Sequence, residues 1–360
     1  MKTYSLLCSF FLALTLPLSA LGFPETARHG YVSCSTCHFS PSGRGLLTPY
    51  GKTIAKELYS SLRNLADSQE TEAPNSPWHV GGQFRLLQWF SQTPSIEKAR
   101  FFPMQSELEG AYDQNTWALI ASVGAWRPMD STQKAYRAYS RNHFLLLRPS
   151  EELILRFGHF RVNHGLGLPD HTILTTESLG WTHSHETYNS EFTYLLDDLV
   201  FQATLLSPSK LLVNDESFEG LSLAFTKAFN SKHKLGLNLS QFNREGIAEN
   251  QFNLHGIATL SESSFFQAEA AYRHFRDKTK SEQAALFSRL SYELRQRLRP
   301  FVQLEAAAVE PNKNNITHRG SIGFEWFPIN YFDLFFSAGK QSSPNADDST
   351  IITAIGHFYF

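Results

Sequence analysis

The sequence predicts an all-β protein: a transmembrane antiparallel β-barrel preceded by a small, mostly irregular or helical segment. Three observations lead to this fold class. From residue 78 onward, apolar and polar residues alternate with a period of two. The alternating stretches run for about 9 to 13 residues, the length that a tilted strand needs to cross a bilayer. Aromatic residues make up 14% of the chain, yet its mean hydropathy is only -0.28.

Charge and hydropathy exclude two other classes. The formal net charge is -2, whereas a nucleic-acid-binding protein needs a basic excess to neutralise phosphates. No nucleic-acid partner is therefore expected. A helical membrane protein would show several apolar runs of about 20 residues, and the chain has one such run, at its start.

That first run, residues 1–22, has the pattern of a secretory signal peptide. Lys2 precedes an apolar centre, and small residues at Ala20 and Gly22 favour cleavage after Gly22. The alternative is a retained membrane anchor. Cys8 lies within the apolar centre and is expected to leave with the peptide, so the exported chain keeps Cys34 and Cys37.

These two cysteines lie in the stretch GYVSCSTCHFSPSGRG, residues 30–45. Cys-x-x-Cys-His is the attachment signal of c-type haem. Two thiols, two residues apart, reach the two vinyl groups at one edge of the porphyrin, and the adjacent histidine becomes an axial iron ligand. The motif predicts one covalent haem c, with thioether bonds to Cys34 and Cys37 and with His38 on the iron. Haem of this type is attached outside the cytoplasm, in agreement with the export signal.

Other uses of the cysteine pair fit the sequence less well. A structural zinc site needs four ligands, and no second cysteine pair is present. A thioredoxin-like redox pair requires a βαβ context, and none follows. A simple disulfide beside an unrelated histidine remains the other interpretation.

The second axial ligand of the iron is less clear. After signal removal the methionines are Met104 and Met129, both far along the chain, so the haem segment supplies no thioether ligand of its own. His29 precedes Cys34 by five residues and would reach the far face of the ring if the chain looped back, and His79 is a weaker candidate. An open or water-bound iron is the alternative.

The remainder of residues 23–76 forms a periplasmic haem segment and linker. Residues 39–50 are rich in Pro, Gly and Ser and are expected to form turns rather than a core. Apolar residues at helical spacing then predict one short helix, through Ile54, Leu58, Leu62 and Leu65. The stretch TEAPNSP resembles a linker.

Residues 77–360 are expected to form the barrel. In KLGLNLSQF, residues 234–242, Leu235 and Leu239 lie on one face and Asn238 and Ser240 on the other. A soluble β-sandwich also alternates, but here the polar faces carry charges of both signs, which is typical of a water-filled lumen. Aromatic residues near strand ends predict interfacial girdles: Trp78, Trp89, Phe90, Trp117, Trp126, Trp326, Phe327, Tyr331 and Phe332.

The number of strands follows from the connections. Short turns near residues 113–116, 148–152, 230–233, 261–264 and 328–330 alternate with longer polar links such as RDKTKSE, EPNKNN and QSSPNADDST. Short turns are expected on the periplasmic side and longer loops outside. A hidden turn at Asp197–Asp198 gives about sixteen strands, an even number with both ends periplasmic; fourteen or eighteen would also fit. A barrel of this size leaves an aqueous channel.

The longest loop, residues 163–188, contains His164, His171, His183 and His185. Two interpretations stay open: a polar loop that folds into the pore and narrows it, or a metal or anion site. With the preceding RFGHFRV, the region is similar to part of the phosphate-selective and related substrate-specific porins. No residue roles follow from that similarity.

The chain ends in STIITAIGHFYF. A terminal Phe360, with Phe358 two residues before it, resembles the C-terminal signal of bacterial outer-membrane β-barrels, although Gly356 lies one place later than the glycine of that pattern. As a whole the chain resembles haem-bearing porin-like proteins of bacterial outer membranes. The resemblance implies a location in the outer membrane, contact with its lipid, and a periplasmic N-terminal segment.

Three functions follow from these expectations. The favoured one is electron transfer at the periplasmic side, with periplasmic or outer-membrane c-type cytochromes as partners. The second is a solute-specific porin for small solutes or ions, whose haem segment gates or anchors the channel. The third is a haem enzyme such as a peroxidase, but no distal acid–base pair is identified near the motif, and no catalytic residue is assigned.

Overall fold

The computed structural model describes residues 33–58, 76–126, 137–168, 172–178, 186–207, 218–229, 232–244, 246–277, 280–295, 297–310, 315–344 and 346–360. The predicted signal peptide 1–22 and His29 lie outside these ranges. The described N-terminal part contains a 3₁₀ turn η2 (Cys34–Thr36) and the helix α2 (Pro49–Leu58). A short helix α3 (Leu174–Ser178) lies in the loop that follows the sixth strand.

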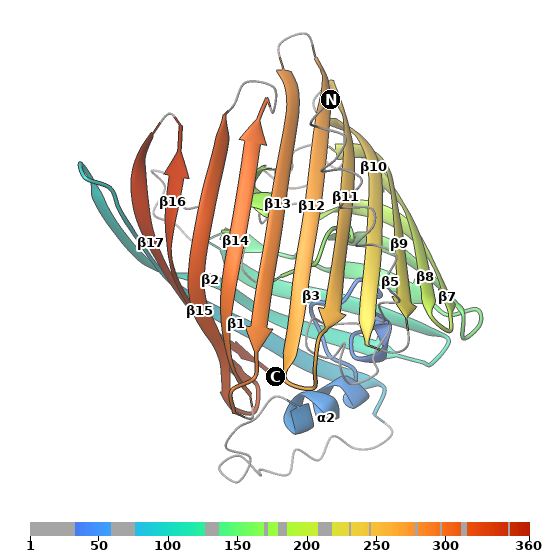
Figure 1. The fold of residues 1–360 in the computed structure, drawn as a ribbon. Coiled ribbons are helices and arrows are strands. Elements are labelled where there is room, and N and C mark those ends of the chain that lie inside the picture. Colours follow the sequence, from blue (N-terminus) through green and yellow to red (C-terminus); the bar gives the residue numbers. More distant parts are fainter. Residues whose placement is uncertain are drawn as a thin grey trace.

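The remainder of the described chain is one antiparallel sheet that closes on itself (Figure 1). Its strands are β1 (Trp78–Gln92), β2 (Glu97–Asp113), β3 (Trp117–Trp126), β4 (Arg137–Tyr139), β5 (His143–Leu147), β6 (Leu153–Arg161), β7 (Glu186–Leu196), β8 (Leu199–Ser207), β9 (Phe218–Phe229), β10 (His233–Arg244), β11 (Ile247–Thr259), β12 (Ser264–Asp277), β13 (Lys280–Tyr292), β14 (Leu298–Val309), β15 (Ile316–Ile329), β16 (Phe332–Ser343) and β17 (Ala346–Tyr359). The sheet closes where β1 pairs with β17, from Gln83 opposite Tyr359 to Gln92 opposite Thr350.

The closed barrel has sixteen strands, because β4 and β5 are two parts of one. Both pair with β3, and residues 140–142 bulge between them. The Ser122 hydroxyl accepts the backbone N–H groups of Arg141 and Asn142 at 3.2 and 3.0 Å, which satisfies the backbone at the bulge. The predicted strand number is confirmed. So is the turn at Asp197–Asp198, where Leu196 pairs directly with Leu199.

Several links are shorter than the sequence predicts. Strand β12 continues to Asp277 and β13 begins at Lys280, so most of RDKTKSE is strand. The polar stretch QSSPNADDST is likewise divided between β16 and β17. The prediction of long loops is wrong at these two places, because cross-strand pairing continues into polar sequence. The strands from β10 to β17 therefore have 12 to 14 residues, whereas β5 has 5 and β6 has 9.

Along most strands, polar side chains face the interior and apolar side chains face the exterior. On β7, Asn189 and Glu191 are 4% and 2% exposed, whereas Phe192 and Tyr194 are each 39% exposed. A soluble protein would bury the aromatic residues instead, so the outer wall matches a lipid surface. The predicted faces of residues 234–242 are confirmed, since Asn238 is buried and Leu239 is exposed. No helix in the described part of the chain has the length and apolar character needed to span a membrane.

The rim at which β1 begins and β17 ends carries an aromatic cluster; we call it the terminal rim. The ring of Tyr112 lies 4.7 Å from that of Trp78 and 5.7 Å from that of Trp117, measured between ring centroids. Phe332 and Phe358 stack at 4.2 Å on the same rim. Aromatic side chains of this kind concentrate at membrane–water interfaces, and the predicted girdle is present here.

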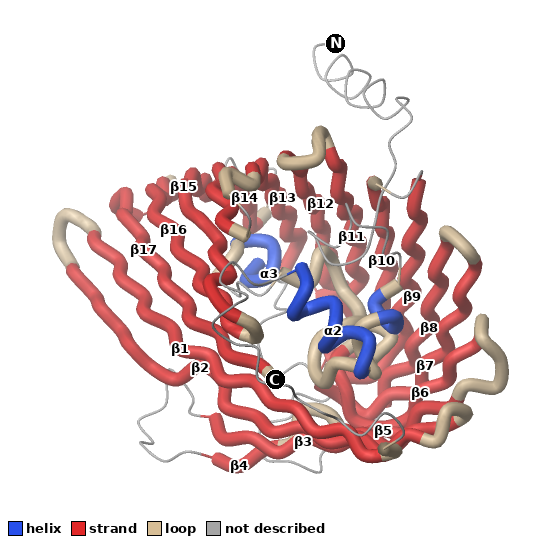
Figure 2. Tube along the Cα trace, turned by 90° about the horizontal axis from the view of Figure 1, so that it is seen from below, coloured by secondary structure: helices blue, strands red, loops and turns tan. Residues whose placement is uncertain are grey.

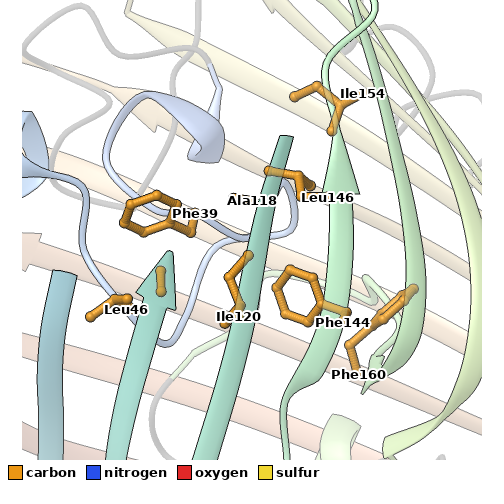
Figure 3. Close-up of a cluster of buried hydrophobic side chains, with 9 residues drawn as sticks. Phe39, Leu46, Ala118, Ile120, Phe144, Leu146, Ile154 and Phe160 are labelled. Carbon is orange, nitrogen blue, oxygen red and sulfur yellow. The ribbon is translucent and has the colours of Figure 1, made fainter. Parts of the chain in front are cut away.

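Residues 33–58, which we call the N-terminal segment, lie at the terminal rim (Figures 1 and 2). The part before α2 reaches the inner wall, and α2 itself lies at the opening of the barrel. Phe39 and Leu46 pack on the inner wall with Ala118, Ile120, Phe144, Leu146, Ile154 and Phe160 (Figure 3). The prediction that residues 39–50 form turns outside any core is therefore wrong for these two side chains. Burial of each stabilises the docked segment by about 1.5–3 kcal/mol.

The loop between β6 and β7, which we call the inner loop, enters the lumen from the opposite end. Its described residues, 162–168 and 172–178, contact the inner wall on the far side of the barrel. The backbone N–H groups of Gly165 and Leu174 donate to Asn238 and Glu305 at 3.0 and 2.5 Å. Arg319 donates to the Thr172 carbonyl at 2.6 Å. Of the two interpretations of this loop, the pore-narrowing one fits these contacts.

Candidate functional site: the Cys-x-x-Cys-His turn in the lumen

The Cys-x-x-Cys-His motif forms a single tight turn. Ser33 caps it, since its hydroxyl accepts the N–H of Ser35 at 3.3 Å. The N–H groups of Cys37 and His38 both donate to the Cys34 carbonyl, at 3.2 and 2.9 Å. Both thiols and the imidazole therefore belong to one hydrogen-bonded turn.

The residues after the turn fold back along it. Phe39 N–H donates to the Leu46 carbonyl at 3.1 Å, and Thr48 N–H donates to the Cys37 carbonyl at 2.9 Å. His38 and Leu47 form an antiparallel bridge. The stretch between them is thus a hairpin, and its tip at Gly43 lies against Cys34: a Cβ at Gly43 would be 3.3 Å from the Cys34 sulfur.

The His38 imidazole is oriented by a backbone carbonyl. Its Nδ1 lies 3.3 Å from the Gly45 carbonyl oxygen. A carbonyl can only accept, so Nδ1 carries the proton and Nε2 keeps the lone pair that a metal would bind. Burial lowers the pKa of His38 to about 4, against the opposing effect of the Gly45 and Arg44 carbonyls. The ring is therefore neutral at pH 7, the form that ligates metals.

The cysteines differ from a reactive redox pair. Both are free thiols. Burial, followed by the nearby Cys34, raises the pKa of Cys37 to about 11. Redox-active and zinc-binding cysteines instead require thiolates, with pKa values lowered by positive neighbours. The turn does not favour those two alternatives.

The residues present fit a covalent haem. Two free thiols flank two residues, and the neighbouring imidazole has its Nδ1–H engaged, as expected for a histidine that ligates metal through Nε2. Cys34, Cys37 and His38 would hold the group. Within the described residues no set of three or more His, Cys, Asp or Glu side chains could hold a metal ion by itself. A haem does not need such a set, because the porphyrin supplies four of the iron's ligands.

Helix α2 and its capping residue pack against the turn. Thr48 caps the helix, accepting the Gly51 N–H at 3.0 Å, and Pro49 occupies the first helical position, where proline is favoured. The Thr48 hydroxyl also donates to the Thr36 carbonyl at 3.2 Å. Gly51 touches the motif so closely that an added Cβ would lie 2.1 Å from the Cys37 carbonyl oxygen.

A Gly51→Ala variant is therefore expected to push the turn away from α2. Overpacking of this kind costs about 1–3 kcal/mol. We expect residues 33–58 to become more sensitive to limited proteolysis and a smaller fraction of the protein to carry haem after denaturing electrophoresis. Thr53→Ala, at an exposed position of the same helix, is the matched control. Equal proteolysis and equal haem content in the two variants would contradict the supporting role of Gly51.

A buried arginine of the barrel wall holds the hairpin in place. Arg156 on β6 donates to the hydroxyls of Ser40 and Ser42 at 2.7 and 3.2 Å. It pairs with Glu191 at 2.8 Å, with both side chains almost fully buried, and it stacks 3.6 Å above the Phe160 ring. Hydrogen bonds to charged groups contribute about 1.5–3 kcal/mol each. These polar contacts add to the apolar anchoring by Phe39.

Helix α2 is fixed to the terminal rim. Lys52 donates to the Val80 carbonyl at 3.0 Å, and Arg297 donates to the Glu57 carbonyl. The ammonium of Lys56 lies 5.6 Å from the centroid of the Tyr331 ring. The N-terminal segment is thus tied to the wall at both its hairpin and its helix, and it occupies part of the lumen.

The other predicted histidines have separate positions. His29, the candidate second axial ligand, lies outside the described residues, as do His171, His183 and His185. His79 is buried on β1, with its ring centroid 5.2 Å from that of Phe39. His164 lies on the inner loop and lines a small cavity with Arg44. The structure thus brings His79 and His164 close to the N-terminal segment and leaves the metal-site interpretation of residues 183 and 185 untested.

Solved structures match this fold although sequence comparisons find nothing. No protein-family model matches the chain, and neither does any curated protein. A loop L8 deletion mutant of OmpT, an outer membrane protein of Vibrio cholerae, superposes with a TM-score of 0.63 at 12% identity, covering 79% of this chain and 99% of that one. The outer membrane channel DcaP of Acinetobacter baumannii gives 0.56 at 11% identity, covering 79% and 97%.

An anion-selective porin from Comamonas acidovorans gives a TM-score of 0.57 at 10% identity, covering 79% of this chain and 99% of that chain. At this level of identity the similarity shows the fold alone. The chain is a closed sixteen-strand antiparallel β-barrel, and its fold is that of these outer-membrane proteins.

Proposed function

We propose that this protein is a porin-like barrel of the bacterial outer membrane that carries one covalent c-type haem and takes part in electron transfer at the periplasmic side. Cys34 and Cys37 would form the thioethers and His38 would be the axial ligand. The observation that carries the proposal is the Cys-x-x-Cys-His turn, whose imidazole presents Nε2 while Gly45 holds Nδ1. When bound, the group supplies a one-electron centre.

The location of the turn supports a role near the periplasm. Helix α2 of the N-terminal segment is fixed at the terminal rim, where the first strand of the barrel begins and the last one ends. In outer-membrane barrels with an even strand number, both ends are periplasmic. The turn would thus lie within reach of periplasmic donors or acceptors, for which other c-type cytochromes are the expected partners. A single centre at this rim does not by itself cross an apolar band about 25 Å tall.

The side from which electrons enter tests the proposal. A reduced soluble c-type cytochrome is too large to pass the outer membrane. We expect it to reduce the protein's haem in opened outer-membrane vesicles, and not in sealed vesicles whose outer face points outward. The Cys34→Ser/Cys37→Ser variant gives the background. Equal reduction in sealed and opened vesicles would show entry from the outer face and contradict the periplasmic assignment.

A second function is favoured by the partial occupation of the lumen. The N-terminal segment occupies space that an open channel would need, held by Phe39, Leu46 and Arg156. A solute channel that this segment gates or anchors would use the same contacts. Conductance of the full-length protein distinguishes the two: a solute channel passes current with the segment present, whereas a barrel that only houses the haem does not.

A further inference from the structure

One peptide group of the N-terminal hairpin connects His38 to the barrel wall. It is the peptide between Gly45 and Leu46. Its carbonyl oxygen lies 3.3 Å from Nδ1 of His38, and its N–H donates to the carboxylate of Glu109 on β2. The carboxylate, the peptide and the imidazole therefore form one continuous chain of hydrogen bonds, which we call the Glu109 relay.

The Glu109 carboxylate has a fixed position on the inner wall. The residue is only 4% exposed, and its Oε1 accepts the side-chain amide of Gln83 at 2.9 Å. Its Oε2 lies against the hairpin, since a Cβ on Gly45 would be 2.8 Å from it. Gly45 also has a φ of 65°, in the left-handed region that favours glycine. A glycine thus permits both the turn of the hairpin and the close approach of the carboxylate.

A second carboxylate of the same strand provides a comparison. Glu107 is also 4% exposed, and it accepts the side-chain amide of Gln105 at 2.8 Å. The guanidinium groups of Arg85 and Arg141 interact electrostatically with both Glu107 and Glu109. The two carboxylates therefore have similar charged surroundings. They differ in that Glu109 contacts the peptide that orients His38.

A negative charge at one end of the relay affects the other end. Hydrogen bonds in a chain polarise one another, so the carboxylate makes the Gly45 carbonyl a stronger acceptor for the Nδ1–H of His38. A strong acceptor at Nδ1 fixes the ring and raises the basicity of a ligating imidazole. Hydrogen bonding around the ligands is one of the ways in which a protein sets the reduction potential of a haem.

We propose that Glu109 is a positioning residue that orients the His38 imidazole through the Gly45–Leu46 peptide and lowers the reduction potential of the haem iron. The effect on the potential rests on the proposed covalent haem, because a more basic Nε2 stabilises ferric iron over ferrous iron. The orientation of the imidazole is a property of the polypeptide alone.

The orientation is tested in protein without haem, with the full-length Cys34→Ser/Cys37→Ser variant as the background. The NMR resonance of the His38 Nδ1 proton, assigned by its absence after His38→Ala, reports the strength of the hydrogen bond to the Gly45 carbonyl. A weaker hydrogen bond moves this resonance upfield.

Two substitutions of Glu109 separate its charge from its contact. Glu109→Gln removes the charge and keeps an oxygen that can accept the Leu46 N–H, whereas Glu109→Asp keeps the charge and withdraws it by one methylene group. Both should move the resonance upfield, and Glu107→Gln should leave it in place. No shift with either substitution of Glu109, or equal shifts in Glu109→Gln and Glu107→Gln, would overturn the proposal. If Glu109→Gln does not fold, Glu109→Asp decides.

The midpoint potential tests the effect on the haem. At about pH 8.5, well above the ordinary pKa of a carboxyl group, Glu109→Gln should have a more positive potential than the wild type, by a larger amount than Glu107→Gln. Equal potentials in Glu109→Gln and the wild type would overturn this part of the proposal. A wild-type protein without covalent haem would contradict the proposed electron transfer and the effect on the potential, whereas the Nδ1 resonance would still decide whether Glu109 orients His38.

Discussion

Deleting residues 23–76, with the signal peptide kept, is expected to increase the single-channel conductance of the barrel several-fold. The deletion removes Phe39 and Leu46 from the lumen and α2 from its opening, and it leaves the sixteen-strand wall intact. Barrels of this size have an aqueous interior when nothing fills it. The measurement is the current through purified protein in a planar bilayer, for the full-length chain and the deletion. The same conductance in both proteins would contradict a segment seated in the lumen.

A point substitution tests the same docking without removing any chain. Arg156→Gln breaks the contacts to Ser40 and Ser42 and leaves Glu191 buried without its arginine. Breaking a buried pair in this way costs about 3–5 kcal/mol. We expect frequent full openings of the channel. Arg148→Gln is the control, because Arg148 pairs with Asp113 at the partly exposed terminal rim, where such a pair contributes about 0–1 kcal/mol.

Replacing both cysteines, Cys34→Ser with Cys37→Ser, is expected to abolish haem that survives denaturation. Only thioether bonds keep haem on an unfolded chain, and the sequence after the predicted signal peptide holds no other cysteine. Heat-modified migration on gels should show that the barrel still folds, since the substitution leaves the inner-wall contacts of Phe39 in place. Equal haem staining in the variant and the wild type would contradict attachment through this pair.

The companion variant His38→Ala separates attachment from ligation. Both thiols remain, so covalent haem should still be detected, while the ferric spectrum should change because the iron loses a nitrogen ligand. An unchanged spectrum would show that His38 is not the axial ligand. The pair of variants thus distinguishes the roles of the cysteines from that of the histidine.

The barrel wall could be predicted because lipid and lumen impose a period of two on every strand. Leu239 faces lipid and Asn238 the lumen, as the alternation predicts. The turn at Asp197–Asp198 was predictable from two acidic residues between apolar runs of strand length. The strand ends were less predictable: Asp277 and Lys280 look like loop residues locally, but cross-strand pairing continues through them.

The contents of the lumen could not be predicted in the same way. Ser40 and Arg156 are 116 residues apart in the chain, and no local pattern connects them. Phe39 and the pair Leu46–Leu47 are a few apolar residues in a stretch rich in Pro, Gly and Ser, with neither helical nor strand spacing, so the burial of Phe39 and Leu46 carries no periodic signal. The one local hint was Arg44 between two glycines, a spacing that permits the left-handed tip observed here.

For the candidate haem site, the sequence provides the motif but not its surroundings, and the haem itself stays a prediction. The spacing of Cys34, Cys37 and His38 defines the motif, but the carbonyl of Gly45 that orients the imidazole and the close contact of Gly51 depend on a hairpin and a helix folding together. Neither contact has a sequence signature of its own. The second axial ligand stays a prediction, because His29 lies outside the described residues.

Haem staining of outer-membrane fractions after denaturing electrophoresis tests the central claim most directly. The protein should be produced in cells able to mature c-type cytochromes, and the stained band should be quantified by its pyridine haemochrome spectrum. The expected result is one covalent haem per chain in the outer-membrane fraction. A band of the correct mass in that fraction without covalent haem would contradict the claim. The protein would then be a porin-like barrel whose lumen is partly occupied by the N-terminal segment.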